Sequence, residues 1–219
     1  MTMDRTVAVI GGTGHLGAAL AGRWARAGVR IVIGSRDAAR AQAAADEIGH
    51  GATGAANAEA AAQAEIVVLA VPFAAQTGTI ADIKDAAQGK IVVDTTVPLV
   101  PPKVMRVQLP VEGSAAARTQ ALLGEGVTLI SAFHNVAAHK LATDEDVDCD
   151  VLVFGDDKAA RETGIVLAEA AGLRGLHAGA LANSAAAEAL TSILIFLNKT
   201  YKVDGAGLRI TGTLTPPEA

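Results

Sequence analysis

A glycine-dense turn at residues 11–17 constrains the fold of this chain more than any other stretch. An apolar run at residues 6–10 precedes the turn, and an amphipathic run at residues 18–27 follows it. Strand, glycine turn and helix in this order are the context that a dinucleotide-binding fingerprint requires. The first part of the chain therefore predicts a nucleotide-binding βα unit.

Three glycines of the turn have distinct expected roles. Gly12 is expected to permit the tight turn, Gly14 to let a pyrophosphate approach the backbone, and Gly17 to let the helix pack closely on the strand. The phosphates would then face free N–H groups at a helix N-terminus. The predicted cofactor-binding residues of the turn are Gly12, Thr13, Gly14, His15, Leu16 and Gly17.

The end of the second predicted strand indicates which dinucleotide is bound. The apolar run at residues 29–33 leads to Ser35 and Arg36, and Arg40 follows one helical turn later. Enzymes for NAD usually carry Asp or Glu about here, which bonds the ribose 2′-hydroxyl. A hydroxyl and two guanidinium groups suit a 2′-phosphate instead, because arginine bonds phosphate bidentately. We therefore predict NADP(H); the alternative is that both arginines are solvated charges at a helix end.

The rest of the chain alternates apolar runs with helical segments, which predicts an α/β fold with a Rossmann-like, doubly wound parallel sheet. Further strands are expected at residues 65–71, 90–94, 127–131, 151–154 and 174–178. Further helices are expected at residues 37–48, 76–87, 114–124, 157–171 and 183–198. We expect an NADP-binding domain at residues 1–145 and a smaller C-terminal part at residues 146–219, which closes over the active cleft.

Composition argues against several classes of protein. The chain has 219 residues, of which 51% are hydrophobic, and a formal net charge of −5 that argues against a nucleic-acid surface. No apolar run reaches the roughly eighteen residues that span a bilayer, and no signal peptide is recognised. Cys149 is the only cysteine, and no metal-ligand pattern stands out. The expectation is a cytoplasmic protein that binds no metal, membrane or nucleic acid.

The sequence offers no obvious proton-transfer machinery. The only tyrosine, Tyr201, has Gly205 four residues later, so the Tyr–Lys pair of short-chain dehydrogenases is absent. His134 and His139 are five residues apart and have no carboxylate pair beside them. This scarcity favours hydride transfer between two redox cofactors, which needs alignment and a dry pocket rather than a protein acid or base.

Two later segments have expected roles in the site and in assembly. Residues 95–113 contain four prolines and no periodicity, and they leave the carboxyl end of a predicted strand, where ligands bind in such sheets. They form either a functional loop or a surface excursion.

Residues 193–197 are apolar in succession within the last helix, so the sheet or a second subunit must cover them. We expect a homodimer.

The chain resembles the NADPH:F420 oxidoreductases, which pass hydride between NADP and the deazaflavin coenzyme F420. The resemblance covers most of the chain. It rests on the turn, on Gly34-Ser35-Arg36, Val71-Pro72, Ser131-Ala132-Phe133-His134, Gly155-Asp156-Asp157, Asn183-Ser184 and Glu188-Ala189-Leu190-Thr191. The turn alone is common to many oxidoreductases, whereas the later blocks in this order are more specific.

The resemblance implies roles for individual residues. Thr13, Ser35, Arg36 and Arg40 would hold NADP, and Val71 and Pro72 would line the nicotinamide pocket. The catalytic candidates His134 and Thr191 would lie near the deazaflavin ring, beside small residues that include Ala132. Ala189 stands where the family often has serine, and Phe73 where it has a bulkier aromatic.

Simpler interpretations of these residues stay open. His134 could be a capping or core histidine, and the Thr191 hydroxyl could bond a backbone carbonyl one helical turn back. Two other functions also stay open: a reductase of another small substrate, and a non-enzymatic NADP(H)-binding redox sensor, whose glycine spacing the turn also matches.

Overall fold

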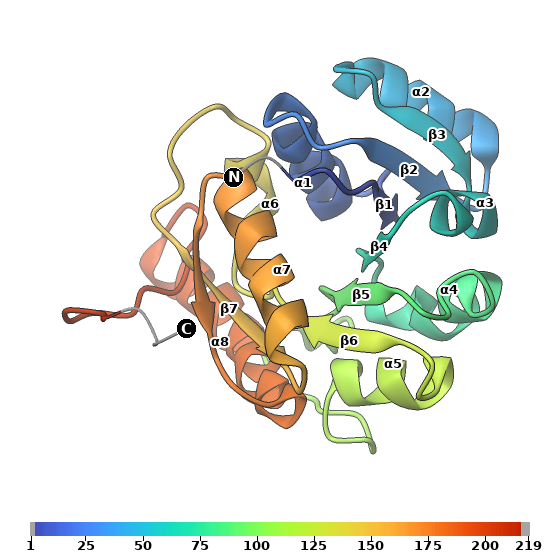
Figure 1. Ribbon diagram of the computed structural model, residues 1–219. Coiled ribbons are helices and arrows are strands. Elements are labelled where there is room, and N and C mark those ends of the chain that lie inside the picture. Colours follow the sequence, from blue (N-terminus) through green and yellow to red (C-terminus); the bar gives the residue numbers. More distant parts are fainter. Residues whose placement is uncertain (1–2, 216–219) are drawn as a thin grey trace.

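The computed structural model describes residues 3–215, which form one eight-stranded sheet with helices on both faces (Figure 1). The strand order is β3-β2-β1-β4-β5-β6-β7-β8. The strands are β1 (Val7–Ile10), β2 (Ile31–Ser35), β3 (Thr53–Ala56), β4 (Ile66–Leu69), β5 (Ile91–Asp94), β6 (Thr128–Ser131), β7 (Asp150–Gly155) and β8 (Arg174–His177). The α-helices are α1 (His15–Arg26), α2 (Ala38–Ile48), α3 (Asn57–Ala62), α4 (Gln76–Ile83), α5 (Ala115–Leu123), α6 (Ala138–Leu141), α7 (Lys158–Ala170) and α8 (Ser184–Tyr201). Short 3₁₀ helices precede two of them, at Phe73–Ala75 and Leu181–Asn183.

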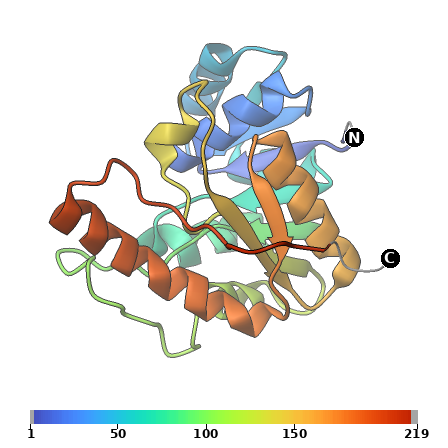
Figure 2. The ribbon, with the colours of Figure 1, turned by 90° about the vertical axis from the view of Figure 1, so that its left-hand side faces the viewer.

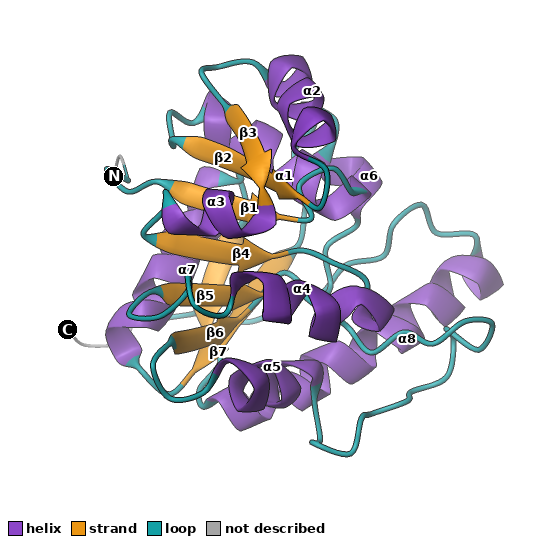
Figure 3. Ribbon diagram, turned by 90° about the vertical axis from the view of Figure 1, so that its right-hand side faces the viewer, coloured by secondary structure: helices purple, strands orange, loops and turns teal. Residues whose placement is uncertain are grey.

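The predicted α/β fold is confirmed, and its core lies on both faces of the sheet. The central strand β1 pairs in parallel with β2 and β4, with Val7 in register with Ile31 and Ile66. All four residues of β1 are fully buried, which explains why the strand is an unbroken apolar run. Side chains of α1, α2 and α7 pack on one face, and those of α3, α4 and α5 on the other, which Figure 3 presents to the viewer.

One strand pair departs from the expected parallel sheet. β6 and β7 are antiparallel, with Ile130 opposite Gly155 and Ser131 opposite Phe154. A parallel pair needs a crossover to the other end of the sheet, usually through a long helix. Residues 132–149 contain only the four-residue α6, and the last two residues of β7 pair with the last two of β6, so the chain enters β7 from the carboxyl end of β6 and runs back. Since β7 and β8 extend the same sheet, the division of the chain at residue 145 stays a prediction.

Three helices begin with a capping side chain at the residue where the sequence predicts the helix to start. The Asp37 carboxylate accepts from the amides of Ala39 and Arg40, at 2.9 and 3.3 Å. The Ser114 hydroxyl accepts from the Ala117 amide at 2.9 Å and the Asp157 carboxylate accepts from the Ala160 amide at 2.7 Å. Each bond satisfies an amide that has no partner inside its own helix.

Two neighbouring side chains of α1 join the first helix to the last third of the chain. The indole N–H of Trp24, which is fully buried, donates to the Leu167 carbonyl in α7 at 2.8 Å. The guanidinium of Arg23 donates to backbone carbonyls at the ends of α6 and α7. Its acceptors at 3.1 Å or less are Leu141, Thr143, Glu145 and Ala171.

The last helix, α8, is covered on one face only. Figure 2 shows it beside the loop of residues 95–113, and the Ser192 hydroxyl donates to the Arg106 carbonyl at 3.3 Å. Leu194 is buried, whereas Ile193 and Phe196 are 47% and 50% exposed. By length and composition the helix at 181–201 could cross a membrane, with a mean hydropathy of 1.3. That is weak evidence, because a helix that packs in a protein core passes the same test.

Candidate active site

The glycine turn lies against neighbouring backbone at three of its glycines. Gly11 has a left-handed φ of +84°, and a Cβ there would lie 2.4 Å from the Ala70 carbonyl oxygen. The tight turn is therefore at Gly11, one residue before the predicted Gly12. A Cβ at Gly12 would lie 2.8 Å from the Val9 oxygen, so Gly12 is required for close packing instead. A Cβ at Gly17 would lie 2.5 Å from the Gly11 oxygen, as close packing of helix on strand predicts.

The N-terminus of α1 has the features of a phosphate-binding site. Gly14 is the N-cap, is exposed, and brings no side-chain hydrogen bond to the first helical amides. A Cβ at Gly14 would meet only the Gly11 oxygen, at 3.3 Å, so the approach to the backbone is open. Amides at such a terminus carry partial positive charge and bind anions. The turn therefore fits a pyrophosphate.

The end of β2, where ribose binding is predicted, has a hydroxyl and two exposed guanidinium groups. Ser35 is the last residue of β2, and Arg36 and Arg40 are exposed on either side of the start of α2. The one carboxylate in this segment, Asp37, is bonded to the first amides of α2. Since that carboxylate already caps a helix, the groups left for a nucleotide are cationic, which fits a 2′-phosphate.

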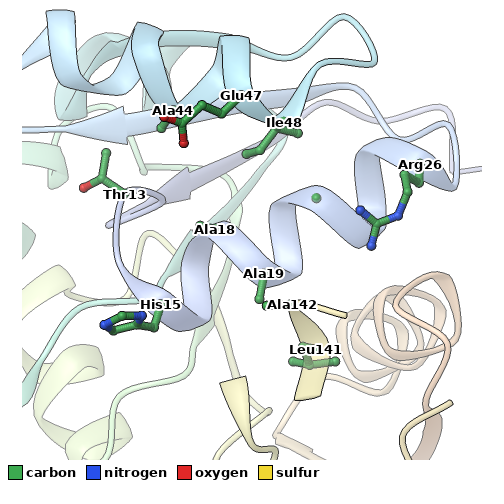
Figure 4. A pocket seen from close by; sticks show the side chains of 11 residues that line it. Thr13, His15, Ala18, Ala19, Arg26, Ala44, Glu47, Ile48, Leu141 and Ala142 are labelled. Atoms are coloured by element: carbon green, nitrogen blue, oxygen red, sulfur yellow. The ribbon is translucent and has the colours of Figure 1, made fainter. Parts of the chain in front are cut away.

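Two side chains of the turn also border a groove between α1 and α2. Figure 4 shows Thr13 and His15 at one end of this groove and Arg26 at the other. The groove has a volume of about 370 Å³, and α2 contributes Ala44, Glu47 and Ile48. Its lining does not include Ser35, Arg36 or Arg40, so it runs beside the predicted nucleotide path rather than along it.

The predicted nicotinamide residues follow β4. Val71 is half-buried and Pro72 is exposed. The Val71 side chain lies so close to the turn that a Cβ on Gly11 would be 2.7 Å from its Cγ1 atom. The structure therefore brings Val71 to the glycine turn, at the carboxyl edge of the sheet where ligands bind in this architecture. Leu16, in the first turn of α1, is half-buried and packs against the core.

His134 is held in a fixed position just after β6. Phe133 has a left-handed φ of +65°, an uncommon conformation for a residue with a side chain, and its buried ring packs edge-on against Trp24 with centroids 5.8 Å apart. His134 is 6% exposed, and its Nε2 atom lies 2.7 Å from the Ser131 hydroxyl. Burial lowers the pKa of His134 to about 3, so the imidazole is neutral at pH 7. Ala132 is fully buried in the core.

Thr191 and His134 meet through the backbone. The Thr191 hydroxyl donates to the His134 carbonyl at 2.9 Å, whereas the Ala187 carbonyl one helical turn back is 3.4 Å away. The Asn135 amide, which the sequence analysis did not single out, donates to the Ala187 carbonyl at 2.9 Å and to the Thr191 hydroxyl at 3.2 Å. His134 and Thr191 also line a common pocket of about 110 Å³.

Sequence reasoning missed a cluster of buried polar residues at the end of β5. Asp94 is fully buried and accepts from the Thr119 hydroxyl at 2.6 Å, and burial raises the pKa of this carboxyl. Glu188, on α8, is 1% exposed, and burial raises its pKa to about 7. The only signal was that Glu188 opens one of the blocks that resemble a known family. Within residues 3–215, no group of three or more His, Cys, Asp or Glu side chains could hold a metal ion.

Three features are together typical of a Rossmann-fold oxidoreductase that uses a nicotinamide cofactor. They are the doubly wound sheet, the glycine turn at a helix N-terminus, and the two exposed arginines after β2. Comparison with known proteins narrows this class. Residues 6–98 match the family model described as NADP oxidoreductase, coenzyme F420-dependent. The F420-dependent NADP reductase of Methanothermobacter thermautotrophicus is 42% identical, over 95% of this chain and 96% of its own length. The enzyme of the same name from Methanocaldococcus jannaschii is 39% identical, over 94% and 97%. The chain belongs to the F420-dependent NADP reductase family.

Solved structures show the same fold at lower sequence identity. A protein of Arthrobacter sp. FB24, described as an F420-dependent NADP reductase, superposes with a TM-score of 0.80 at 24% identity, covering 95% of this chain and 100% of its own. An imine reductase of Myxococcus stipitatus superposes with a TM-score of 0.68 at 20% identity, covering 91% of this chain and 62% of its own. At these identities the likeness concerns the fold alone.

Proposed function

We propose that this chain transfers hydride between NADP(H) and the deazaflavin coenzyme F420. The observation that carries the proposal is the uncapped, glycine-lined N-terminus of α1 beside the basic end of β2, in a chain of the F420-dependent NADP reductase family. When both molecules are bound, nicotinamide C4 and deazaflavin C5 exchange the hydride, and the chain's own contribution is to bind and align them.

The residues that hold NADP(H) in this proposal follow the carboxyl edge of the sheet. The amides of residues 15–17 bind the pyrophosphate, and Ser35, Arg36 and Arg40 bind the 2′-phosphate. Val71 and Pro72 border the nicotinamide, next to the turn. Gly12 and Gly17 act indirectly, because their missing side chains let the turn lie close to β1 and β2. Thr13 and His15 lie at the outer edge of the turn.

His134 and Thr191 border the deazaflavin side, and neither is an obligatory acid or base. A histidine with a pKa of about 3 carries no proton to donate from an imidazolium at pH 7. The neutral ring can still donate one N–H bond to negative charge that develops on the reduced deazaflavin, an electrostatic role. Thr191 contributes by fixing the His134 carbonyl, and with it the segment that carries the ring.

Stopped-flow mixing of the NADPH-loaded protein with oxidised F420 tests the proposal. Bleaching of the deazaflavin absorbance, slowed when NADPH carries deuterium at C4, is the expected result. Tight binding of NADPH without any bleaching would contradict it. NADPH oxidation by another small acceptor would then identify a different reductase, and its absence would favour a redox sensor.

The proposal extends to assembly and location. The exposed apolar face of α8, which includes Ile193 and Phe196, suits a second copy of the chain, because apolar patches of this kind mark interaction sites. We expect a homodimer.

Cys149 is a free, buried thiol, as is usual for the cytoplasm. In this proposal residues 146–219 form the smaller part that closes over the deazaflavin cleft of the NADP-binding domain.

A further inference from the structure

The carboxylate of Glu188 joins α8 to the first turn of α5. Its oxygens accept from the amides of Ala115 at 2.6 Å and Ala116 at 3.1 Å, which lie 73 and 72 residues earlier in the chain. The Ser184 hydroxyl, one turn back in α8, donates to the same carboxylate at 3.2 Å. The start of α5 is therefore capped from outside by a side chain of another helix, as well as by its own Ser114.

The same turn of α8 also holds the segment that carries His134. The Ala187 carbonyl, next to Glu188, accepts from the Asn135 side chain at 2.9 Å. The Thr191 hydroxyl, three residues after Glu188, donates to the His134 carbonyl at 2.9 Å. One short piece of helix is thus bonded both to α5 and to the His134 segment, so a shift of α8 at Glu188 would be transmitted to His134.

The electrostatic partner of Glu188 is a helix terminus rather than a cation. Asp94, from β5, is the charged group whose field reaches it, and this field opposes ionisation. The neighbouring parts of α5 and α8 supply amides and the hydroxyls of Ser114 and Ser184. The partial positive charge at the start of α5 offsets part of the cost of burial and of the nearby Asp94. The net effect still raises the pKa of Glu188, so the packed arrangement favours the protonated carboxyl.

We propose that Glu188 is a positioning residue for the deazaflavin side of the site, through its bonds to α5 and the bonds of its own helical turn to the His134 segment. This inference rests on the proposed function, because it takes His134 to border the deazaflavin. Titration of Glu188 near neutral pH supplies its signature. Because packing against α5 raises the pKa of Glu188, ionisation favours separation of α8 from α5, so the site is better ordered at pH 6 than at pH 8.

The test compares wild type with Glu188→Gln, which keeps the shape and removes the charge. Kd values for F420 and NADP⁺ are measured at pH 6 and pH 8 by fluorescence and calorimetry. We expect the variant to bind F420 about as well as wild type at pH 6 and roughly tenfold more tightly at pH 8, because the variant stays neutral where Glu188 ionises and the contact of α8 with α5 loosens. At each pH, the Kd of the variant is divided by the Kd of wild type, which cancels the effect of any titration of F420 itself. The NADP⁺ ratio should stay near one at both pH values.

The matched control is Glu162→Gln, on the exposed part of α7, which should change neither ratio. An F420 ratio that is the same at pH 6 and pH 8, or an NADP⁺ ratio that changes in parallel, would overturn the proposal. Either result would show that Glu188 supports the fold only.

Hydrogen exchange of the ligand-free chain provides a second readout that needs no activity. After correction for intrinsic rates, residues 133–137 should be more protected in wild type at pH 6 than at pH 8, whereas residues 11–17 should not change. Equal protection at both pH values would contradict the proposal, even if Glu188→Gln failed to fold. If the proposed function itself is wrong, F420 will not bind to wild type, yet the exchange difference will persist.

Discussion

The Thr191 hydroxyl donates to the backbone carbonyl of His134 across 2.9 Å, and this bond joins two residues 57 positions apart. It explains how a threonine in α8 can affect the site without presenting its hydroxyl to a ligand. The bond also fixes the direction of the chain just after Phe133, whose left-handed φ is strained.

Thr191→Val is expected to lower the free energy of unfolding by about 1–3 kcal/mol, because the buried His134 carbonyl and the Asn135 amide both lose a partner. Thr191→Ser keeps the hydroxyl and should retain most of that stability. Urea unfolding of the three proteins measures the difference. Equal stability of the valine variant and wild type would mean that the hydrogen bond contributes nothing.

His134→Ala is expected to slow single-turnover hydride transfer by roughly tenfold or less. General acid–base catalysis typically contributes about a hundredfold or more, and the neutral imidazole is not expected to supply it. Stopped-flow measurement with deuterated NADPH confirms that the hydride step is being timed. A loss of about a thousandfold with F420 affinity intact would instead identify His134 as an essential proton donor.

The buried His134 should also make the fold sensitive to acid. Its pKa is lowered from 6.5 in the unfolded chain to about 3 in the fold, so the unfolded state takes up a proton first as pH falls. The stability that it contributes is complete above pH 6.5 and is lost as pH falls towards 3. The loss should be about 1.4 kcal/mol per pH unit in this range.

Unfolding of wild type and His134→Gln at pH 7.5 and pH 5 isolates this effect. Glu188 and Asp94, whose pKa values are raised, act with the opposite sign in both proteins and cancel in the comparison. We expect the advantage of wild type over the glutamine variant to shrink at pH 5. An advantage that does not depend on pH would show that the histidine titrates normally in the fold.

Arg36→Ala should weaken binding of NADP⁺ by roughly tenfold to a hundredfold and leave binding of NAD⁺ nearly unchanged. The reason is that its guanidinium is predicted to bond the 2′-phosphate, which NAD⁺ lacks. Arg30→Ala is the matched control, because Arg30 is an exposed arginine bonded to Asp4. Calorimetry with both dinucleotides measures the preference. Equal affinities of wild type for the two dinucleotides would refute the assignment.

Phe196→Glu should convert the expected homodimer into a monomer, because it places a charge on the half-exposed apolar face of α8. Lys84→Glu changes the charge of an exposed residue at the C-cap of α4, outside α8, and should leave the dimer intact. Light scattering at micromolar concentration gives the masses. A monomer mass for wild type would disprove the dimer.

Local sequence patterns predicted most of the fold because the sheet is parallel over six strands and, apart from the edge strand β3, these strands are largely buried. Such strands are apolar runs, and capping residues such as Asp37, Ser114 and Asp157 mark where helices begin. The direction of β7 was not predictable, because an apolar run carries no information on which way it lies beside β6. The short α6 was missed for a similar reason, since four residues are too few to establish a helical period.

The candidate site was predictable in part. The turn, the arginines and His134 stand out by type and spacing. The close approach of Gly11 to Ala70, which follows β4, is a contact between distant segments and could not be seen in the local pattern. The pairing of Glu188 with the start of α5 is likewise a tertiary contact between distant segments, which no local pattern encodes.

The partners of Trp24 and Arg23 have a consequence for how the molecule is made. Trp24 donates to a residue 143 positions later, and Arg23 donates to Ala171, 148 positions later. Synthesis proceeds from the N-terminus, so the helix that carries the nucleotide turn emerges long before α7, against which it packs. The first βα unit to leave the ribosome is therefore among the last to complete its packing. Until α7 has emerged, the indole N–H of Trp24 lacks its acceptor at Leu167, and Arg23 lacks its acceptor at Ala171.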